Sequence, residues 1–128
     1  MRILLDTHTV LWWVDGSDQL STLARDLMSD PQTSNLLSVI TMWEVAIKYH
    51  LGRLRIPGTP EEFFSSLTQE LDLIVLPIEK AYAFTAASLP LHHRDPFDRM
   101  LIAQATIENV PILSSDNHLT RYPVQVLW

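Results

Sequence analysis

The hydrophobic positions of this chain fall into short apolar runs separated by longer segments with helical periodicity. The apolar runs predict buried strands at Ile3–Leu5, Asn35–Ser38, Leu73–Leu76 and Pro111–Ser114, and a short fifth strand at Val124–Leu127. The intervening segments are long enough for the right-handed crossovers that join parallel strands. The pattern therefore predicts one doubly wound α/β domain over residues 1–128, with a mostly parallel sheet of four to five strands flanked by helices.

Capping residues and apolar periodicity predict where helices begin and end in the segments between these strands. The periodicity predicts helices at Thr9–Val14, Ser21–Ser29, Thr41–Leu51, Thr59 to about Glu70, Glu79–Ser88 and Asp95–Asn109. The strongest start is at Thr59, which serves as the N-cap, while Pro60 takes the first helical position and Glu62 completes a capping box. Asp95 and Pro96 form a second pair of the same kind. Gly52 is placed to end the third helix in a left-handed conformation.

Composition narrows the classes of protein to be considered. The chain has 128 residues, no cysteine, and 9 Lys+Arg against 15 Asp+Glu, a formal net charge of -6. The lack of cysteine excludes disulfide scaffolds, thiolate metal sites and cysteine nucleophiles. The acidic balance argues against binding nucleic acid by bulk positive charge alone. The start Met1–Asp6 puts a charge, Asp6, inside the apolar region that a signal peptide would need, and no apolar run is long enough to span a membrane, so we expect a soluble, cytoplasmic protein with no membrane partner.

Four carboxylates are predicted to lie at one rim of the sheet. Asp6 follows the first strand, Asp116 follows the fourth, and Glu44 and Asp98 lie in the first turns of helices that start from the same rim. Ligands of open parallel sheets bind beyond the carboxyl ends of the strands. Carboxylates gathered there repel one another and take up either protons or a cation. An all-oxygen ligand set suits Mg²⁺ or Mn²⁺, which points to metal-assisted phosphodiester hydrolysis with one carboxylate as general base.

Each of these acids also has a purely structural interpretation. Asp6 is equally suited to cap the first helix, and Asp116 to cap a turn. Asp98 and Glu44 are acidic residues near helix starts, where the helix dipole favours a negative charge. Position by position the two interpretations stay open, and the convergence of all four acids on one rim favours the metal site.

Four segments of the chain resemble the PIN domain, most closely the VapC-type toxins of bacterial toxin–antitoxin pairs. They are Leu4–His8 (LLDTH), Leu37–Lys48 (LSVITMWEVAIK), His93–Ala105 (HRDPFDRMLIAQA) and Leu113–Asp116 (LSSD). The resemblance covers nearly the whole chain. It implies a three-layer PIN-like fold, and a Mg²⁺- or Mn²⁺-dependent endoribonuclease whose catalytic and metal-binding acids are Asp6, Glu44, Asp98 and Asp116. It also implies an RNA substrate, an antitoxin that blocks the rim with an inserted side chain such as an arginine, and a homodimer.

Several polar side chains flank the acids and are weaker candidates for substrate binding. They are Thr7, Ser38, Thr41, Arg94 and Arg99. The hydroxyls would orient the site, and the two arginines would hold RNA phosphates in an otherwise acidic protein. For the neighbouring His92 and His93, a solvated polar loop is the preferred interpretation.

Two other enzyme or signalling folds match the sequence less well than the nuclease. A phosphatase of the haloacid dehalogenase type needs a second Asp where His8 stands, and a receiver domain needs a Lys near the end, whereas the last lysine is Lys80. Two alternatives of the same fold stay open. One is a non-catalytic PIN-like module that binds other proteins, and the other is a nuclease that acts on DNA.

Overall fold

The computed structural model describes residues 1–128 and contains one five-stranded sheet. Its strands are β1 (Arg2–Leu5), β2 (Ser34–Ser38), β3 (Ile74–Leu76), β4 (Ile112–Leu113) and β5 (Val126–Leu127). All four pairings are parallel, and the order across the sheet is β3-β2-β1-β4-β5. The predicted fold class is therefore confirmed. Since β1 is central, its carboxyl end lies between those of β2 and β4, where chain segments far apart in sequence meet.

Six α-helices connect these strands, and a short 3₁₀ helix, η1, lies between β4 and β5. They are α1 (Thr7–Asp15), α2 (Thr22–Ser29), α3 (Val39–His50), α4 (Pro60–Leu71), α5 (Lys80–Ser88), α6 (Pro96–Glu108) and η1 (Asn117–Arg121). Both α1 and α3 begin two residues earlier than predicted, because the last polar residue of each preceding segment caps the helix directly. Asp6 accepts a hydrogen bond from the Thr7 N–H, and Ser38 accepts one from the Ile40 N–H.

The capping signals in the sequence are confirmed by the geometry. The N–H of Glu62 donates to Thr59 Oγ1 at 3.2 Å, and the N–H of Thr59 donates to Glu62 Oε1 at 3.3 Å, which is the reciprocal pair of a capping box. Asp95 caps α6 by accepting from the Phe97 N–H at 2.9 Å. Gly52 has φ +71°, the left-handed conformation expected after α3.

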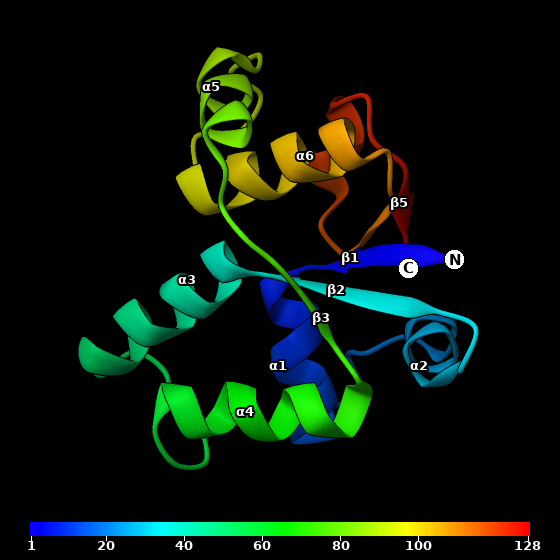
Figure 1. The fold of residues 1–128 in the computed structure, drawn as a ribbon, viewed down its shortest axis with the longest axis vertical. Coiled ribbons are helices and arrows are strands. Elements are labelled where there is room, and N and C mark those ends of the chain that lie inside the picture. Colours follow the sequence, from blue (N-terminus) through cyan, green and yellow to red (C-terminus); the bar gives the residue numbers. More distant parts are fainter.

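Helices cover both faces of the sheet and give the three layers expected (Figure 1). Alternate residues along each strand point to opposite faces. Ile3, Leu5, Leu37 and Leu113 share one core with α1, α2 and α4. Leu4, Leu36 and Ile112 share the other core with α5, α6 and η1. Helix α3 contributes to both cores, and none of the helices is long and apolar enough to cross a membrane.

Candidate functional site

Asp6 lies at the carboxyl end of β1 and is only 5% exposed. Its Oδ1 accepts the Thr7 N–H at 2.7 Å, and its Oδ2 accepts the Ser114 hydroxyl at 2.6 Å. The Ser114 Oγ in turn accepts the N–H of Asp116 at 3.0 Å. Although these donors favour the ionised form, burial raises the pKa of the Asp6 carboxyl above its usual value. The residue caps α1 and also presents a desolvated carboxylate at the rim, so the two interpretations of its position are compatible.

Glu44 reaches the same rim from α3 and is 6% exposed. It lies in the second turn rather than the first, since α3 begins at Val39, and the helix-start interpretation therefore does not apply. Its Oε1 accepts the Thr7 hydroxyl at 2.7 Å, and its Oε2 pairs with Lys48 Nζ at 2.6 Å. Thr41 Oγ1 lies 3.4 Å from Thr7 Oγ1. Thr7 thus connects the start of α1 to the carboxylate of α3.

Asp98 is the third residue of α6 and is held beside His93. The imidazole Nε2 of His93 lies 2.7 Å from Asp98 Oδ2. Burial, followed by the negative charges of Asp6 and Asp95, raises the pKa of Asp98 to about 7; His93 opposes this rise and Glu44 adds to it. A helix N-terminus acting alone would lower the pKa of an acid. The neighbouring carboxylates and burial therefore outweigh the helix dipole at Asp98.

Asp116 completes the rim from the segment after β4 and is its most exposed acid, with 34% of its side chain accessible. It caps η1, since Oδ1 accepts the His118 N–H at 2.9 Å. Its Oδ2 faces His93 Nε2 at 3.7 Å. The donor atoms of His93, Asp98 and Asp116 all lie within 4.8 Å of one another.

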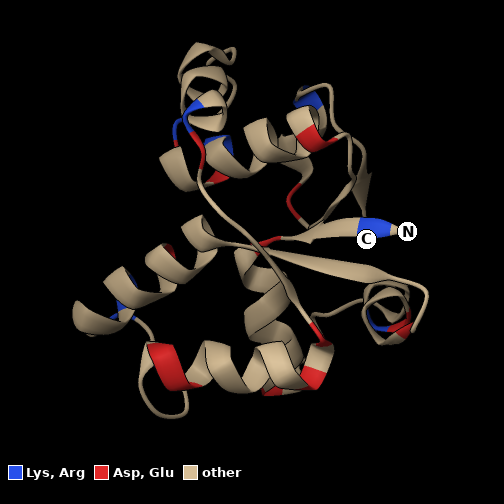
Figure 2. Cartoon of the chain, in the orientation of Figure 1, with Lys and Arg blue, Asp and Glu red and all other residues tan.

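The structure therefore brings the four predicted acids to one edge of the sheet. Figure 2 shows acidic residues at the end of β1, on α3, at the start of α6 and after β4. Sequence reasoning missed three side chains that bind these acids: Ser114, Lys48 as an ion-pair partner, and His93. A signal existed for Ser114, because it ends a strand predicted to lie parallel to β1.

The weaker candidates for substrate binding differ in how far the structure exposes them. Arg99 is 8% exposed, and its guanidinium donates to the backbone carbonyls of Ala86, Leu89, Pro90 and His93 at 2.7–3.2 Å. It therefore holds the α5–α6 loop and does not present its charge to solvent, contrary to the expectation of a phosphate contact. Ser38 and Thr41 are fully buried, which makes them supports of the site and not surfaces for substrate. Arg94 is exposed.

The residues at this rim fit a divalent cation. Asp6, Glu44, Asp98 and Asp116 supply carboxylate oxygens, and His93 adds an imidazole nitrogen. Burial raises the pKa of Asp6, and burial followed by the charges of Asp6 and Asp95 raises the pKa of Asp98, so a cation at this rim would offset both the desolvation and the mutual repulsion of the carboxylates. Oxygen-rich sites of this kind suit Mg²⁺ or Mn²⁺.

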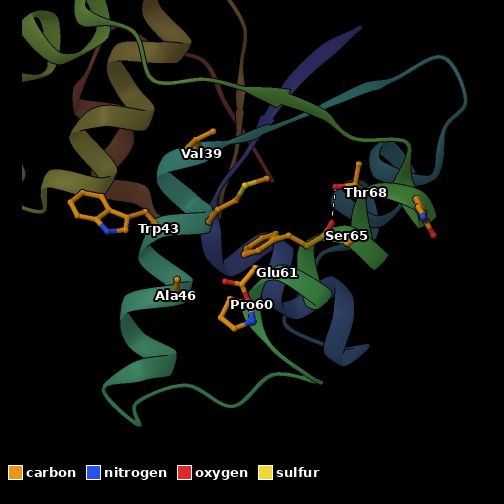
Figure 3. Close-up of a pocket in the computed structure, with 10 residues that line it drawn as sticks. Val39, Trp43, Ala46, Pro60, Glu61, Ser65 and Thr68 are labelled. Atoms are coloured by element: carbon orange, nitrogen blue, oxygen red, sulfur yellow. Dashed lines mark hydrogen bonds between the residues drawn. The ribbon is translucent and has the colours of Figure 1, made fainter.

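A second surface feature lies on the far side of α3 from Glu44. It is a groove of about 670 Å³ between α3 and α4, lined on its apolar side by Val39, Met42, Trp43, Ala46 and Phe64 (Figure 3). Trp43 is 57% exposed there, and its ring packs edge-on against Phe97 with ring centres 5.7 Å apart. An exposed tryptophan beside a groove is typical of a surface that binds another protein.

Solved structures with the same fold include several toxin–antitoxin complexes. The chain matches VapBC2 from Rickettsia felis bound to a promoter DNA fragment (TM-score 0.70, 16% identity, covering 99% of this chain and 98% of that one). It also matches FitAcB from Neisseria gonorrhoeae (TM-score 0.65, 19% identity, 98% and 96% covered) and a toxin–antitoxin complex from Klebsiella pneumoniae (TM-score 0.68, 15% identity, 98% and 96% covered). No curated protein sequence matches the chain.

Sequence comparison with protein families agrees with the resemblance carried by the four segments around Asp6, Glu44, Asp98 and Asp116. A model of the PIN domain matches residues 3–125, which include all four acids, most of β1 and all of β2, β3 and β4, while β5 lies just beyond the match. This protein therefore belongs to the PIN domain family.

Proposed function

We propose that this protein is a Mg²⁺- or Mn²⁺-dependent endoribonuclease that acts in the cytoplasm as the toxin of a toxin–antitoxin pair. The observation that carries the proposal is the convergence of four acidic side chains, from four separate segments, on one rim. Asp6 and Glu44 are almost fully buried there, and the pKa values of Asp6 and Asp98 are raised. A structural role alone does not require carboxylates to be gathered against their mutual repulsion.

The four acids would hold the metal, and their neighbours would hold the acids in place. Ser114 and the Thr7 N–H fix Asp6, while the Thr7 hydroxyl fixes Glu44. A bound divalent cation supplies polarisation of the scissile phosphate and a water of lowered pKa. One carboxylate of the rim then accepts the proton of the attacking water as general base. Lys48 Nζ, which pairs with Glu44 Oε2 at 2.6 Å, would compete with the cation for that oxygen.

The same proposal includes an antitoxin that docks in the groove between α3 and α4. Solved proteins of this fold are found in complexes with antitoxins. Helix α3 carries Glu44 on the rim side and Trp43 and Ala46 on the groove side, so a segment seated in the groove lies about one helix width from the carboxylates. An arginine on a part of the antitoxin that continues past α3 to the rim would pair with them and block the site.

We also propose that two copies of the chain associate, as the family resemblance implies. Light scattering coupled to size exclusion, on the purified chain without its antitoxin, tests this: a mass near 29 kDa, twice the 14.7 kDa of one chain, is expected.

The decisive experiment is incubation of total cellular RNA with the purified protein and Mn²⁺ or Mg²⁺, beside an Asp6→Asn variant and an EDTA control. Discrete fragments that disappear in both controls are expected. Cleavage of DNA in preference to RNA would replace the ribonuclease with a DNA-directed nuclease. If the partner-free protein cleaves neither and binds no Mn²⁺ by calorimetry, a non-catalytic binding module takes its place.

A further inference from the structure

We propose that His93 is itself a metal ligand, and that with Asp98 and Asp116 it forms a mixed nitrogen–oxygen site that selects Mn²⁺ over Mg²⁺. This inference rests on the metal dependence proposed above and adds an imidazole to a site otherwise made of carboxylates. It concerns the outer side of the rim, where α6 begins and where η1 follows β4.

The spacing of the three side chains is that of ligands around one ion. His93 Nε2 lies 2.7 Å from Asp98 Oδ2 and 3.7 Å from Asp116 Oδ2, and all three donor atoms lie within 4.8 Å of one another. With metal–ligand bonds of about 2.1 Å, neighbouring ligands of an octahedral ion are about 3 Å apart and opposite ones about 4.2 Å. The two distances from His93 Nε2, 2.7 and 3.7 Å, lie on either side of the distance of about 3 Å expected for neighbouring ligands, so small side-chain rotations suffice.

The backbone of His93 is fixed independently of its imidazole. Its N–H donates to the Tyr122 hydroxyl at 2.8 Å, and its carbonyl accepts from Arg99 Nη1 at 3.2 Å. The Tyr122 hydroxyl itself donates to the carbonyl of Pro90 at 2.9 Å. These bonds tie the loop to the buried Arg99, and they hold the imidazole at the rim as a preorganised ligand must be held.

The carboxylates of Asp98 and Asp116 have fewer hydrogen-bond and ion-pair partners than those of Asp6 and Glu44. Asp6 and Glu44 accept hydrogen bonds or an ion pair on both oxygens, from Thr7, Ser114 and Lys48. The polar contact of the Asp98 side chain is with His93 alone, and Oδ2 of Asp116 likewise faces only His93. Three donors converge here without other protein partners, and the side chain of His93 is 24% exposed, which leaves room for water or phosphate to complete the coordination.

Ligand chemistry determines which ion this set prefers. Mg²⁺ takes oxygen ligands and retains its waters, whereas imidazole nitrogen suits transition metals. Of the two ions proposed for this rim, a site with one imidazole and two carboxylates therefore favours Mn²⁺, the transition metal, over Mg²⁺. The competing interpretation is that His93 only neutralises Asp98 and Asp116 as a positively charged ion-pair partner; both interpretations explain the 2.7 Å contact, but only one places nitrogen on the metal.

The test is pulsed electron paramagnetic resonance of Mn²⁺ bound to the full chain. The wild-type protein, His93→Asn and His92→Asn are compared. His92 is the matched control, because it is the adjacent histidine, is exposed, and packs its ring against Tyr122 without joining the cluster. We expect echo modulation from a directly bound imidazole nitrogen in the wild type and in His92→Asn, and none in His93→Asn. In calorimetry, His93→Asn should weaken Mn²⁺ binding about tenfold or more and Mg²⁺ binding by less than about threefold.

The outcomes separate this inference from the proposed function. Mn²⁺ bound to the wild type without nitrogen modulation overturns the role of His93 and leaves metal-dependent cleavage standing. An equal loss of Mn²⁺ and Mg²⁺ affinity in His93→Asn also overturns the selectivity. A wild-type protein that binds no Mn²⁺ overturns both proposals. Absence of nitrogen modulation in the wild-type spectrum overturns the role of His93 whether or not any variant folds.

Discussion

The hydroxyl of Thr7 donates a 2.7 Å hydrogen bond to Glu44 Oε1 and so joins two residues 37 positions apart. Thr7 is the first residue of α1 and follows Asp6, while Glu44 lies in the middle of α3. Through this bond the position of the Glu44 carboxylate depends on Thr7, the residue that follows Asp6. The acids of the rim are therefore a connected set, and changes at their supports should alter metal binding without removing a carboxylate.

We expect Thr7→Val to weaken Mn²⁺ binding by about 10- to 100-fold, because Glu44 loses the donor that orients it. The folded state should also lose about 1–3 kcal/mol, since a buried carboxylate oxygen is left without that donor. Thr7→Ser keeps the hydroxyl and is the control that should bind Mn²⁺ nearly as the wild type does. Calorimetry and urea unfolding measure the two effects. Equal affinities for Thr7→Val and the wild type would show that Glu44 is not oriented by Thr7.

The raised pKa of Asp98 predicts a pH-dependent stability in metal-free protein. Because burial and neighbouring acids raise this pKa from 3.8 to about 7, the folded state holds a proton between these values that the unfolded state has released. The free energy of unfolding should therefore fall as pH rises from about 4 to about 7. It should recover when Mg²⁺ or Mn²⁺ is added.

Asp98→Asn isolates this effect. In EDTA the variant should unfold at a higher urea concentration than the wild type at pH 8, and its stability should vary less between pH 5 and pH 8. At the same time it should lose RNA cleavage. A variant that is less stable than the wild type at pH 8, yet still cleaves RNA, would instead mean that Asp98 mainly stabilises the start of α6.

Arg99 and Arg94 should respond to substitution in opposite ways. Arg99→Ala removes a buried guanidinium bonded to four carbonyls, so we expect a loss of about 2–4 kcal/mol in the free energy of unfolding. Arg94 is exposed, and Arg94→Ala should change stability by less than about 0.5 kcal/mol. Arg94→Ala should instead weaken RNA binding and reduce its salt dependence. Thermal unfolding and RNA titrations at several salt concentrations distinguish the two roles.

The groove between α3 and α4 gives a prediction that is independent of the rim. Ala46→Glu places a charge among apolar groove residues and should reduce co-purification of the proposed antitoxin by about tenfold or more. RNA cleavage should be unchanged, because Ala46 does not contact the acids. Ile107→Glu introduces the same charge at an exposed apolar position of α6 outside the groove and should leave the partner bound. Partner loss in both variants would locate the interface elsewhere.

Local rules in the sequence determined the elements and the positions of the acids along them. The capping box at Thr59 and Glu62 acts over three residues, and Asp95 with Pro96 starts α6 by similarly local bonds. The parallel sheet follows from the alternation of apolar runs and helices. Once the strands are known to be parallel, Asp6 and Asp116 must lie at the same edge. For that reason the four acids could be predicted to converge.

Only the tertiary structure decided which side chains support these acids. Ser114 meets Asp6 across 108 positions because β1 and β4 pair with Leu5 opposite Leu113, a register that apolar patterning does not specify. From the sequence, Arg99 is a candidate for phosphate binding. In the structure its side chain extends from α6 toward the α5–α6 loop and donates to backbone carbonyls there. His93 reaches Asp98 because that same loop is bound by Arg99 and Tyr122. Residue type and spacing determine an element, whereas partners distant in the chain depend on strand register and side-chain direction, which exist only after the layers have packed.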